Sequence, residues 1–140
     1  MSIQFVVNSP LRVVTYSVIG SVSASDAKNL LEAILEHPRF RTGYCFLGDR
    51  RRMDSAPTGE YVRAVASLVE KYSDRLAPCR WAVLVSNHVG YGMARMWSLL
   101  ASDSGVNIHP FFELTEAVEW LGLPHGYRPE ILCEIETSRC

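Results

Sequence analysis

The sequence lacks the signals that mark most membrane and secreted proteins. No apolar run approaches the roughly 20 residues that a membrane-spanning helix needs. The segment 1–5 has no basic start followed by an apolar run and a cleavage site. The cysteines include no pair with the two-residue spacing of a zinc or redox site: Cys45, Cys79, Cys133 and Cys140. Isolated cysteines within apolar runs are typical of a reducing compartment, so we expect a cytoplasmic protein.

An excess of charge of one sign is also missing. The chain has 14 basic and 15 acidic residues, which gives a net charge of −1. No strong overall field therefore attracts nucleic acid or an anionic membrane surface, and we expect neither as a partner.

Signatures of catalysis and of cofactor binding are scarce. There is no Gly-x-Ser-x-Gly elbow, and Gly90 and Gly92 are too closely spaced for a dinucleotide or phosphate-loop fingerprint. The histidines are scattered, so a metal site would form only if the fold brought its ligands together: His37, His88, His109 and His125. We expect no metal, no cofactor and no catalytic residues, which favours a binding or regulatory module over an enzyme.

The sequence does contain strand and helix patterns in alternation. Residues 3–7 and 11–19 are β-rich, and the short turn between them predicts an antiparallel pair. Buried strands are expected in the apolar runs at 44–47, 81–85 and 106–112. Helical spacing follows Ser23, whose partner three residues on is Asp26, and follows Pro57, which suits a first helical turn. Further helices are expected after Asn87 and after Thr115.

This order, ββαβαβαβα, predicts a single α/β domain over residues 1–124. Repeated strand–helix–strand units imply a mixed, mostly parallel sheet of about five strands with about four helices. Residues 125–140 form a tail in which Ile131, Cys133 and Ile135 alternate. The tail is expected to add an edge strand or to contact a second subunit in a homodimer.

Several segments carry a likeness to a known family. They are the opening hairpin, His37-Pro38-Arg39-Phe40, the strand that runs into Asp49-Arg50-Arg51, Arg80-Trp81-Ala82-Val83, and the closing segment 115–121. With these features residues 3–123 resemble the SpoIIAA-like branch of the STAS superfamily, which is related in fold to the CRAL-TRIO lipid carriers. The resemblance implies the same α/β fold.

The resemblance also bears on a phosphorylation switch. STAS proteins that oppose anti-sigma factors carry a phosphorylatable serine where the second helix begins. The corresponding stretch here is Asp54-Ser55-Ala56-Pro57, with Ala56 at the usual acceptor position. Ser55 or Thr58 would therefore have to accept the phosphate.

Two polar loops are the predicted binding site, because ligands of open α/β sheets bind outside the carboxyl ends of strands. The first loop offers Asp49, Arg50, Arg51, Arg52, Asp54 and Ser55 beside a helix start. The second offers Asn87, His88 and Tyr91, and Trp97 follows on the next helix, where it either lines an apolar pocket or packs in the core. We expect these loops to recognise a partner protein or a small anionic or lipid-like ligand.

Two other readings stay open at the level of sequence. One is a small hydrolase or transferase that uses Ser55 or Ser86 as nucleophile with His88 as base. The other is a structural subunit of a homo-oligomer that associates through the last helix and the tail.

Overall fold

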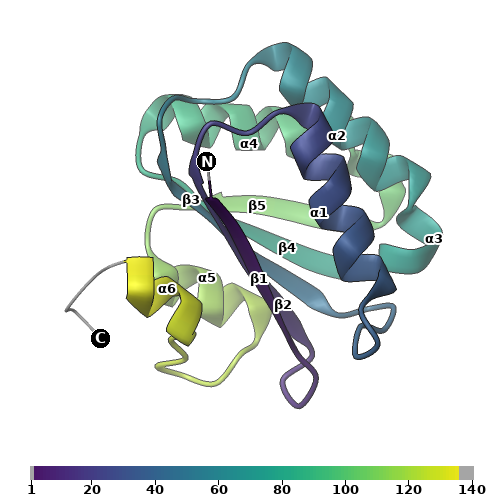
Figure 1. The fold of residues 1–140 in the computed structure, drawn as a ribbon, viewed down its shortest axis with the longest axis vertical. Coiled ribbons are helices and arrows are strands. Elements are labelled where there is room, and N and C mark those ends of the chain that lie inside the picture. Colours follow the sequence, from purple (N-terminus) through teal and green to yellow (C-terminus); the bar gives the residue numbers. More distant parts are fainter. Residues whose placement is uncertain (1, 136–140) are drawn as a thin grey trace.

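The structure is a computed structural model that describes residues 2–135, and its centre is one five-stranded sheet. Strands lie side by side in chain order: β1 (Ser2–Asn8), β2 (Val13–Gly20), β3 (Cys45–Met53), β4 (Cys79–Leu84) and β5 (Val106–Phe111). β1 pairs antiparallel with β2, and all the other pairs are parallel. The predicted mixed, mostly parallel sheet is therefore confirmed (Figure 1).

Helices cover both faces of this sheet. They are α1 (Ala24–Glu36), α2 (Gly59–Lys71), α3 (Ser73–Leu76), α4 (His88–Leu100), α5 (Leu114–Leu121) and α6 (Glu130–Ile135), with a short 3₁₀ turn, η1 (Ser102–Ser104). Parallel crossovers are right-handed, and each strand here adds beside the previous one, so the crossover helices α1, α2 and α4 all fall on one face. α5 and α6 lie on the other face (Figure 1).

The sheet is buried on both faces, as its apolar runs predict. Phe46 and Trp81 point toward α1, α2 and α4, whereas Leu47 and Ala82 point toward α5 and α6. Because successive side chains of a strand point to opposite faces, a strand covered on both sides is apolar throughout. No helix within residues 2–135 is both long and apolar enough to cross a bilayer.

A layer of aromatic rings fills the face under the three crossover helices. The rings of Phe46 and Trp81 stack with centroids 4.1 Å apart, and the indole N–H of Trp81 donates to the Tyr16 hydroxyl at 3.0 Å. The Tyr16 ring occupies the space that a Cβ at Gly48 would need. Gly48 is therefore required for this ring to lie flat across β3.

Helix starts agree only in part with the sequence patterns. Ser23 and Asp26 form the predicted capping box of α1. The second helix begins later than predicted, since Thr58 caps α2 and Pro57 lies before the cap instead of in the first turn. Thr115 was expected to cap the last predicted helix, but α5 begins at Leu114 without a side-chain cap.

The main correction to the predicted fold concerns the residues that follow the 44–47 run. β3 continues through Asp49 to Met53, so the predicted polar loop is in its first half a strand. β2 is long enough to pair with this extension, and Ile19 lies opposite Arg52 beyond a local irregularity in register. β4 ends at Leu84, opposite Asp49, so the extension has a single strand neighbour and tolerates polar side chains.

The tail also departs from its prediction. Residues 130–135 form helix α6 instead of an edge strand, and residues 136–140 lie outside the described part of the chain. Ile131 and Leu132 are buried against the α5 face of the sheet. Two consecutive buried residues fit a helix end better than the period-two alternation of a strand.

The outer edge strand explains the proline within the last predicted run. Pro110 lies inside β5, opposite Val83. The carbonyls of Gly105 and Phe111 accept hydrogen bonds from β4, so the alternate residue Pro110 faces the open edge of the sheet. A proline is compatible with that position because its missing N–H has no ladder partner there.

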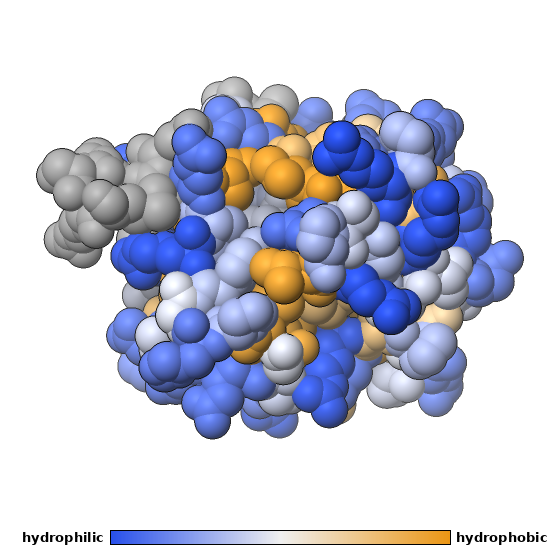
Figure 2. All heavy atoms as spheres, turned by 90° about the horizontal axis from the view of Figure 1, so that it is seen from below, coloured by the Kyte–Doolittle hydropathy of each residue, from blue (hydrophilic) through white to orange (hydrophobic). Residues whose placement is uncertain are grey.

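The end of the molecule that carries the β1–β2 hairpin is mostly hydrophilic. Viewed from this end, apolar atoms reach the surface in limited areas between polar side chains (Figure 2). An open depression at the amino ends of β3 and β4 is lined by Cys45, Cys79 and Arg80 among others. Burial raises the pKa of both thiols, that of Cys79 to about 12, so neither is an activated nucleophile.

Candidate ligand-binding site

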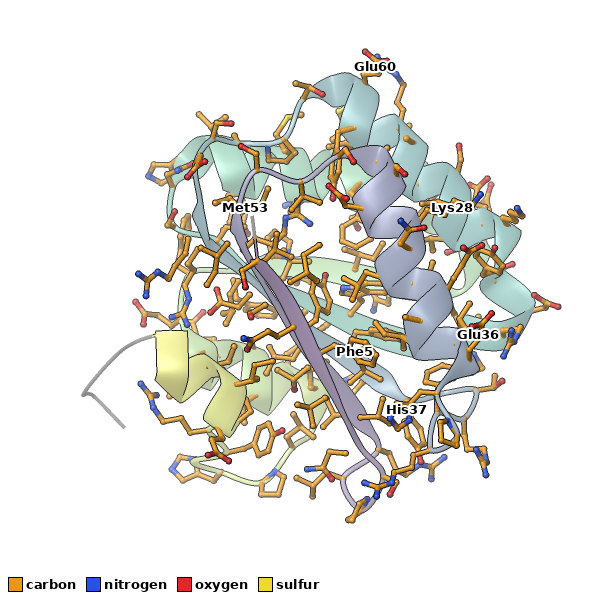
Figure 3. All side chains as sticks on the ribbon, in the orientation of Figure 1. Phe5, Lys28, Glu36, His37, Met53 and Glu60 are labelled. Carbon is orange, nitrogen blue, oxygen red and sulfur yellow. The ribbon has the colours of Figure 1, made fainter. Side chains whose placement is uncertain are left out.

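A pocket opens where β3 and β4 end, beneath the first turns of α2 and α4. Its empty volume is about 680 Å³ with the mouth included. In Figure 3, Met53 marks the end of β3, and Glu60 marks the start of α2 beyond the loop that follows. The lining residues are Arg50, Met53, Asp54, Ser55, Ala56, Pro57, Tyr61, Val62, Val65, Val83, Val85, Ser86, Asn87, Gly90, Met93, Ala94 and Trp97.

Two helix caps fix the upper rim of the pocket. The Thr58 hydroxyl accepts a hydrogen bond from the Tyr61 N–H at 3.1 Å at the start of α2. The side-chain oxygen of Asn87 accepts one from the Gly90 N–H at 2.8 Å at the start of α4. One amide of each helix start is thereby satisfied within the protein.

Arg50 is the cation of this pocket. Its side chain is half-buried, and its Nη2 donates to the Tyr61 hydroxyl at 3.2 Å, with the guanidinium carbon 5.3 Å from the centre of the Tyr61 ring. Burial raises the pKa of Tyr16 to about 12, and the positive charge of Arg50 nearby opposes that rise. Within residues 2–135 no carboxylate forms an ion pair with Arg50.

Asp49 and Arg51 lie away from the pocket. Strand alternation places them on the opposite face of β3 from Arg50. Asp49 is 1% exposed and accepts from Arg51 Nε at 3.0 Å and from Arg51 Nη2 at 2.9 Å. Arg52 is exposed and does not line the pocket. Of the four residues 49–52 that were predicted to bind a ligand together, the structure brings only Arg50 to the pocket.

The next predicted residues, Asp54 and Ser55, lie at the mouth of the pocket. Both are exposed, and the Asp54 carboxylate accepts a hydrogen bond from the Ser21 hydroxyl at 3.3 Å. Thr58 is the cap of α2 and does not line the pocket.

Of the residues predicted in and after the second loop, some line the pocket and others do not. Ser86 and Asn87 line the pocket, and Trp97 lines its inner wall with 6% of its surface exposed. His88 and Tyr91 lie beside the pocket, where both rings pack on Phe112, with centroids 5.5 Å and 5.1 Å away. Ser86 therefore lines the pocket, whereas the His88 ring packs on Phe112 beside it.

Tyr61 is a pocket side chain that the sequence patterns did not single out. It reaches Arg50 from α2, eleven positions further along the chain. The available signal was its place one turn into a capped helix, on the same stripe as Val65. A residue on the apolar stripe of a helix is normally interpreted as part of the core. Only the position of Arg50 on β3, next to Tyr61, shows that this side chain also has a polar contact.

A second cavity lies under α1 and α2, with an empty volume of about 510 Å³ that includes its opening to solvent, and its lining is mainly apolar. It shares Arg50, Tyr61, Val65 and Trp97 with the first pocket. The Arg50–Tyr61 hydrogen bond therefore lies in the wall that the two spaces have in common. No group of three or more metal-ligating side chains is found in residues 2–135.

The architecture, with its hairpin, its crossover helices on one face and its pocket at the strand ends, is the SpoIIAA-like fold. The chain is similar to the crystal structure of an uncharacterized protein of the DUF3478 family with a SpoIIAA-like fold from Shewanella loihica PV-4. The TM-score is 0.59 at 14% sequence identity, over 85% of this chain and 93% of that one. No protein-family model and no curated protein matches the chain. At this identity the likeness confirms the fold expected from the sequence, and function has to be argued from the site.

Proposed function

We propose that this domain is a non-enzymatic binding module whose pocket takes a small anionic ligand with an apolar body. The observation that carries the proposal is Arg50, a half-buried guanidinium whose hydrogen-bond partners within residues 2–135 are the hydroxyls of Tyr61 and Tyr16, with no carboxylate paired to it there. A cation removed from water is costly unless a counter-charge compensates it. An anionic ligand would supply that counter-charge.

The walls of the pocket support the rest of the proposal. Val62, Val83, Val85 and Ala94 are buried aliphatic residues, and together with Trp97 they form a lining suited to an apolar ligand body. Pockets with mainly apolar walls and a few polar groups are the usual form of small-molecule sites. The polar groups of Ser55, Ser86 and Asn87 are confined to the mouth.

A partner protein remains the second version of this proposal. Beside the pocket, Val89 is 64% exposed and Phe112 is 38% exposed, next to His88 and Tyr91. Exposed apolar side chains that adjoin polar loops are typical of protein contacts. We place either activity in the cytoplasm, as the isolated cysteines indicate. Ser55 and Thr58 stay predictions as phosphate acceptors.

The test is a titration with small amphipathic anions, followed by tryptophan fluorescence because Trp97 lines the pocket, and by native mass spectrometry. Arg50→Met should weaken binding of any anion that binds by about tenfold or more, since a charged hydrogen bond is lost. Arg63→Met is the matched control, because Arg63 is exposed on α2 outside the pocket. Its affinity should stay within about twofold of the parent.

Two results would count against the proposal. One is a panel in which no anion binds saturably to protein that circular dichroism shows to be folded. The other is an Arg50→Met variant that binds as tightly as the Arg63→Met control.

A further inference from the structure

The geometry points to a narrower ligand class: a single carboxylate on a compact apolar body, held by Arg50 and Tyr61 together. This inference rests on the proposed function and specifies it. It excludes two neighbouring classes, phosphate esters and long-chain acids, by separate arguments from charge and from shape.

The first argument is the charge of the pocket. Among its lining residues, all in the described part of the chain, Arg50 is the one cation and Asp54 is the one acid. A phosphate ester carries about −1.5 to −2 charges at neutral pH, whereas a carboxylate carries one. A single guanidinium matches a single negative charge, and Asp54 at the mouth repels any excess.

The helix caps reduce the number of donors that the pocket rim can offer to a phosphate. Phosphate sites at helix starts use the unpaired N–H groups of the first turn. In this pocket the Tyr61 and Gly90 amides already donate to Thr58 and Asn87. The rim therefore offers fewer donors than an uncapped helix start does.

The second argument is the direction of the hydrogen bonds at Arg50. A guanidinium has five N–H donors, and the bonds to the Tyr61 and Tyr16 hydroxyls occupy at most two of them. The remaining donors include a planar pair that can grip both oxygens of a carboxylate. The Tyr61 hydroxyl accepts from Arg50 and so keeps its own proton for donation. Tyr61 is thereby a specificity-determining residue that both positions Arg50 and donates to the carboxylate.

The third argument is the wall that the pocket shares with the apolar cavity under α1 and α2. Arg50, Tyr61, Val65 and Trp97 line both spaces, so the Arg50–Tyr61 hydrogen bond belongs to this wall. A long chain that reaches that cavity has to pass this wall, and we expect its passage to disturb the hydrogen bond that positions the guanidinium. A compact ring that stays between the aliphatic wall and the Trp97 indole is expected to leave the pair in place.

Isothermal titration calorimetry of the full chain with four probes tests the inference at pH 7.5. The probes are benzoate, phenyl phosphate, benzamide and decanoate. We expect benzoate to bind about tenfold or more tightly than phenyl phosphate and than benzamide, and decanoate to bind no more tightly than benzoate. Asp54→Asn should improve the affinity for phenyl phosphate more than that for benzoate.

The role of Tyr61 is tested with a matched pair of variants. Tyr61→Phe should weaken benzoate binding by about tenfold while leaving benzamide binding almost unchanged, because only the carboxylate contact is lost. Tyr91→Phe is the control, since Tyr91 lies beside the pocket on Phe112 and does not line it. Benzoate affinity should not change in that variant.

The outcomes separate the inference from the proposal on which it rests. Tighter binding of phenyl phosphate overturns the carboxylate assignment, and tighter binding of decanoate overturns the compact body, while an anion site remains in both cases. Equal binding of benzoate and benzamide removes the role of charge. Failure of all four probes to bind folded protein overturns the inference and counts against the proposed function as well.

Discussion

Gly48 and Gly92 differ in whether the structure has room for a side chain at their positions. A Cβ at Gly48 would overlap the buried Tyr16 ring, which is held by the Trp81 indole. Gly48→Ala should therefore lower the free energy of unfolding by about 3 kcal/mol, the upper range for overpacking a core. Urea denaturation followed by circular dichroism measures this change.

A control substitution should change the free energy of unfolding in the opposite direction. Gly92 lies in α4 with no atom within 4 Å of its would-be Cβ. Gly92→Ala should raise the free energy of unfolding by about 0.5–1 kcal/mol, because alanine is the better helix former. Equal effects of the two substitutions would contradict the packing described for Tyr16.

His109 provides a prediction about pH. Burial lowers its pKa from the ordinary value of 6.5, and the positive charge of Arg95 lowers it further. A histidine with a depressed pKa stabilises the fold in its neutral form, so its contribution is present above pH 6.5 and is lost as the pH falls through the lower folded-state value. An NMR titration of the His109 ring should give a midpoint below 6.5.

The substitution Arg95→Gln checks the second cause of this shift. It should move the His109 midpoint upward without restoring it fully, because burial is the larger cause. A midpoint at the ordinary value in the parent protein would show that the ring between Phe111 and Trp120 is more hydrated than its contacts indicate.

At the scale of secondary-structure elements, the start of α2 can be measured directly. Thr58→Ala removes the hydroxyl that accepts from the Tyr61 amide and should cost about 1 kcal/mol of stability. Ser55→Ala should change stability by less than about 0.5 kcal/mol, since Ser55 is exposed and makes no cap. Thermal denaturation compares the two variants. The reverse order would place the helix start at Ser55.

Elements built on long apolar patterns could be predicted from sequence, and those that depend on a distant neighbour could not. Trp81–Val85 reads as a buried strand by itself, and the structure places most of it in β4. The extension of β3 through Arg50 depends on pairing with the end of β2, which no local pattern reveals. Apolar residues alternate in the tail as they do in a strand. The tail nevertheless forms helix α6, which packs on the face of the sheet opposite α1.

In the site, too, residues could be predicted from local patterns but not from contacts between segments that are distant in the sequence. The idea that ligands gather at strand ends led to Arg50, Asp54, Ser55 and Asn87, all of which line the pocket. The same idea could not distinguish Arg50 from Arg51, because the segment was predicted as a loop. Only in a strand do successive side chains point to opposite faces of the sheet. Tyr61 was missed because its place in the pocket depends on a contact with Arg50 of β3, which the pattern of its own helix does not show.

At the scale of the whole molecule, α6 completes the second core. Leu132 is fully buried beneath the sheet, in contact with the cluster that includes Val13 and Leu47. Leu132→Ala should cost about 3 kcal/mol through the lost burial and the cavity that remains. Leu99→Ala is the control, because Leu99 is 69% exposed, and it should cost less than about 0.5 kcal/mol.

Denaturant titration of both leucine variants tests whether the tail is part of the domain. A loss of stability in Leu132→Ala alone would place residues 130–135 within the folding unit. No difference between the variants would leave α6 as an appendage, and the predicted subunit contact through the tail would then gain weight.

The strand order has a consequence for how the chain is made. Since β1 to β5 lie side by side in the order of synthesis, each strand that leaves the ribosome finds its neighbour already in place. We expect the nascent sheet to grow by one strand at a time, with the newest strand always at its rim. The late step is the return of α6 to β1 and β2, which joins the last helix to the first hairpin after the rest of the domain has formed.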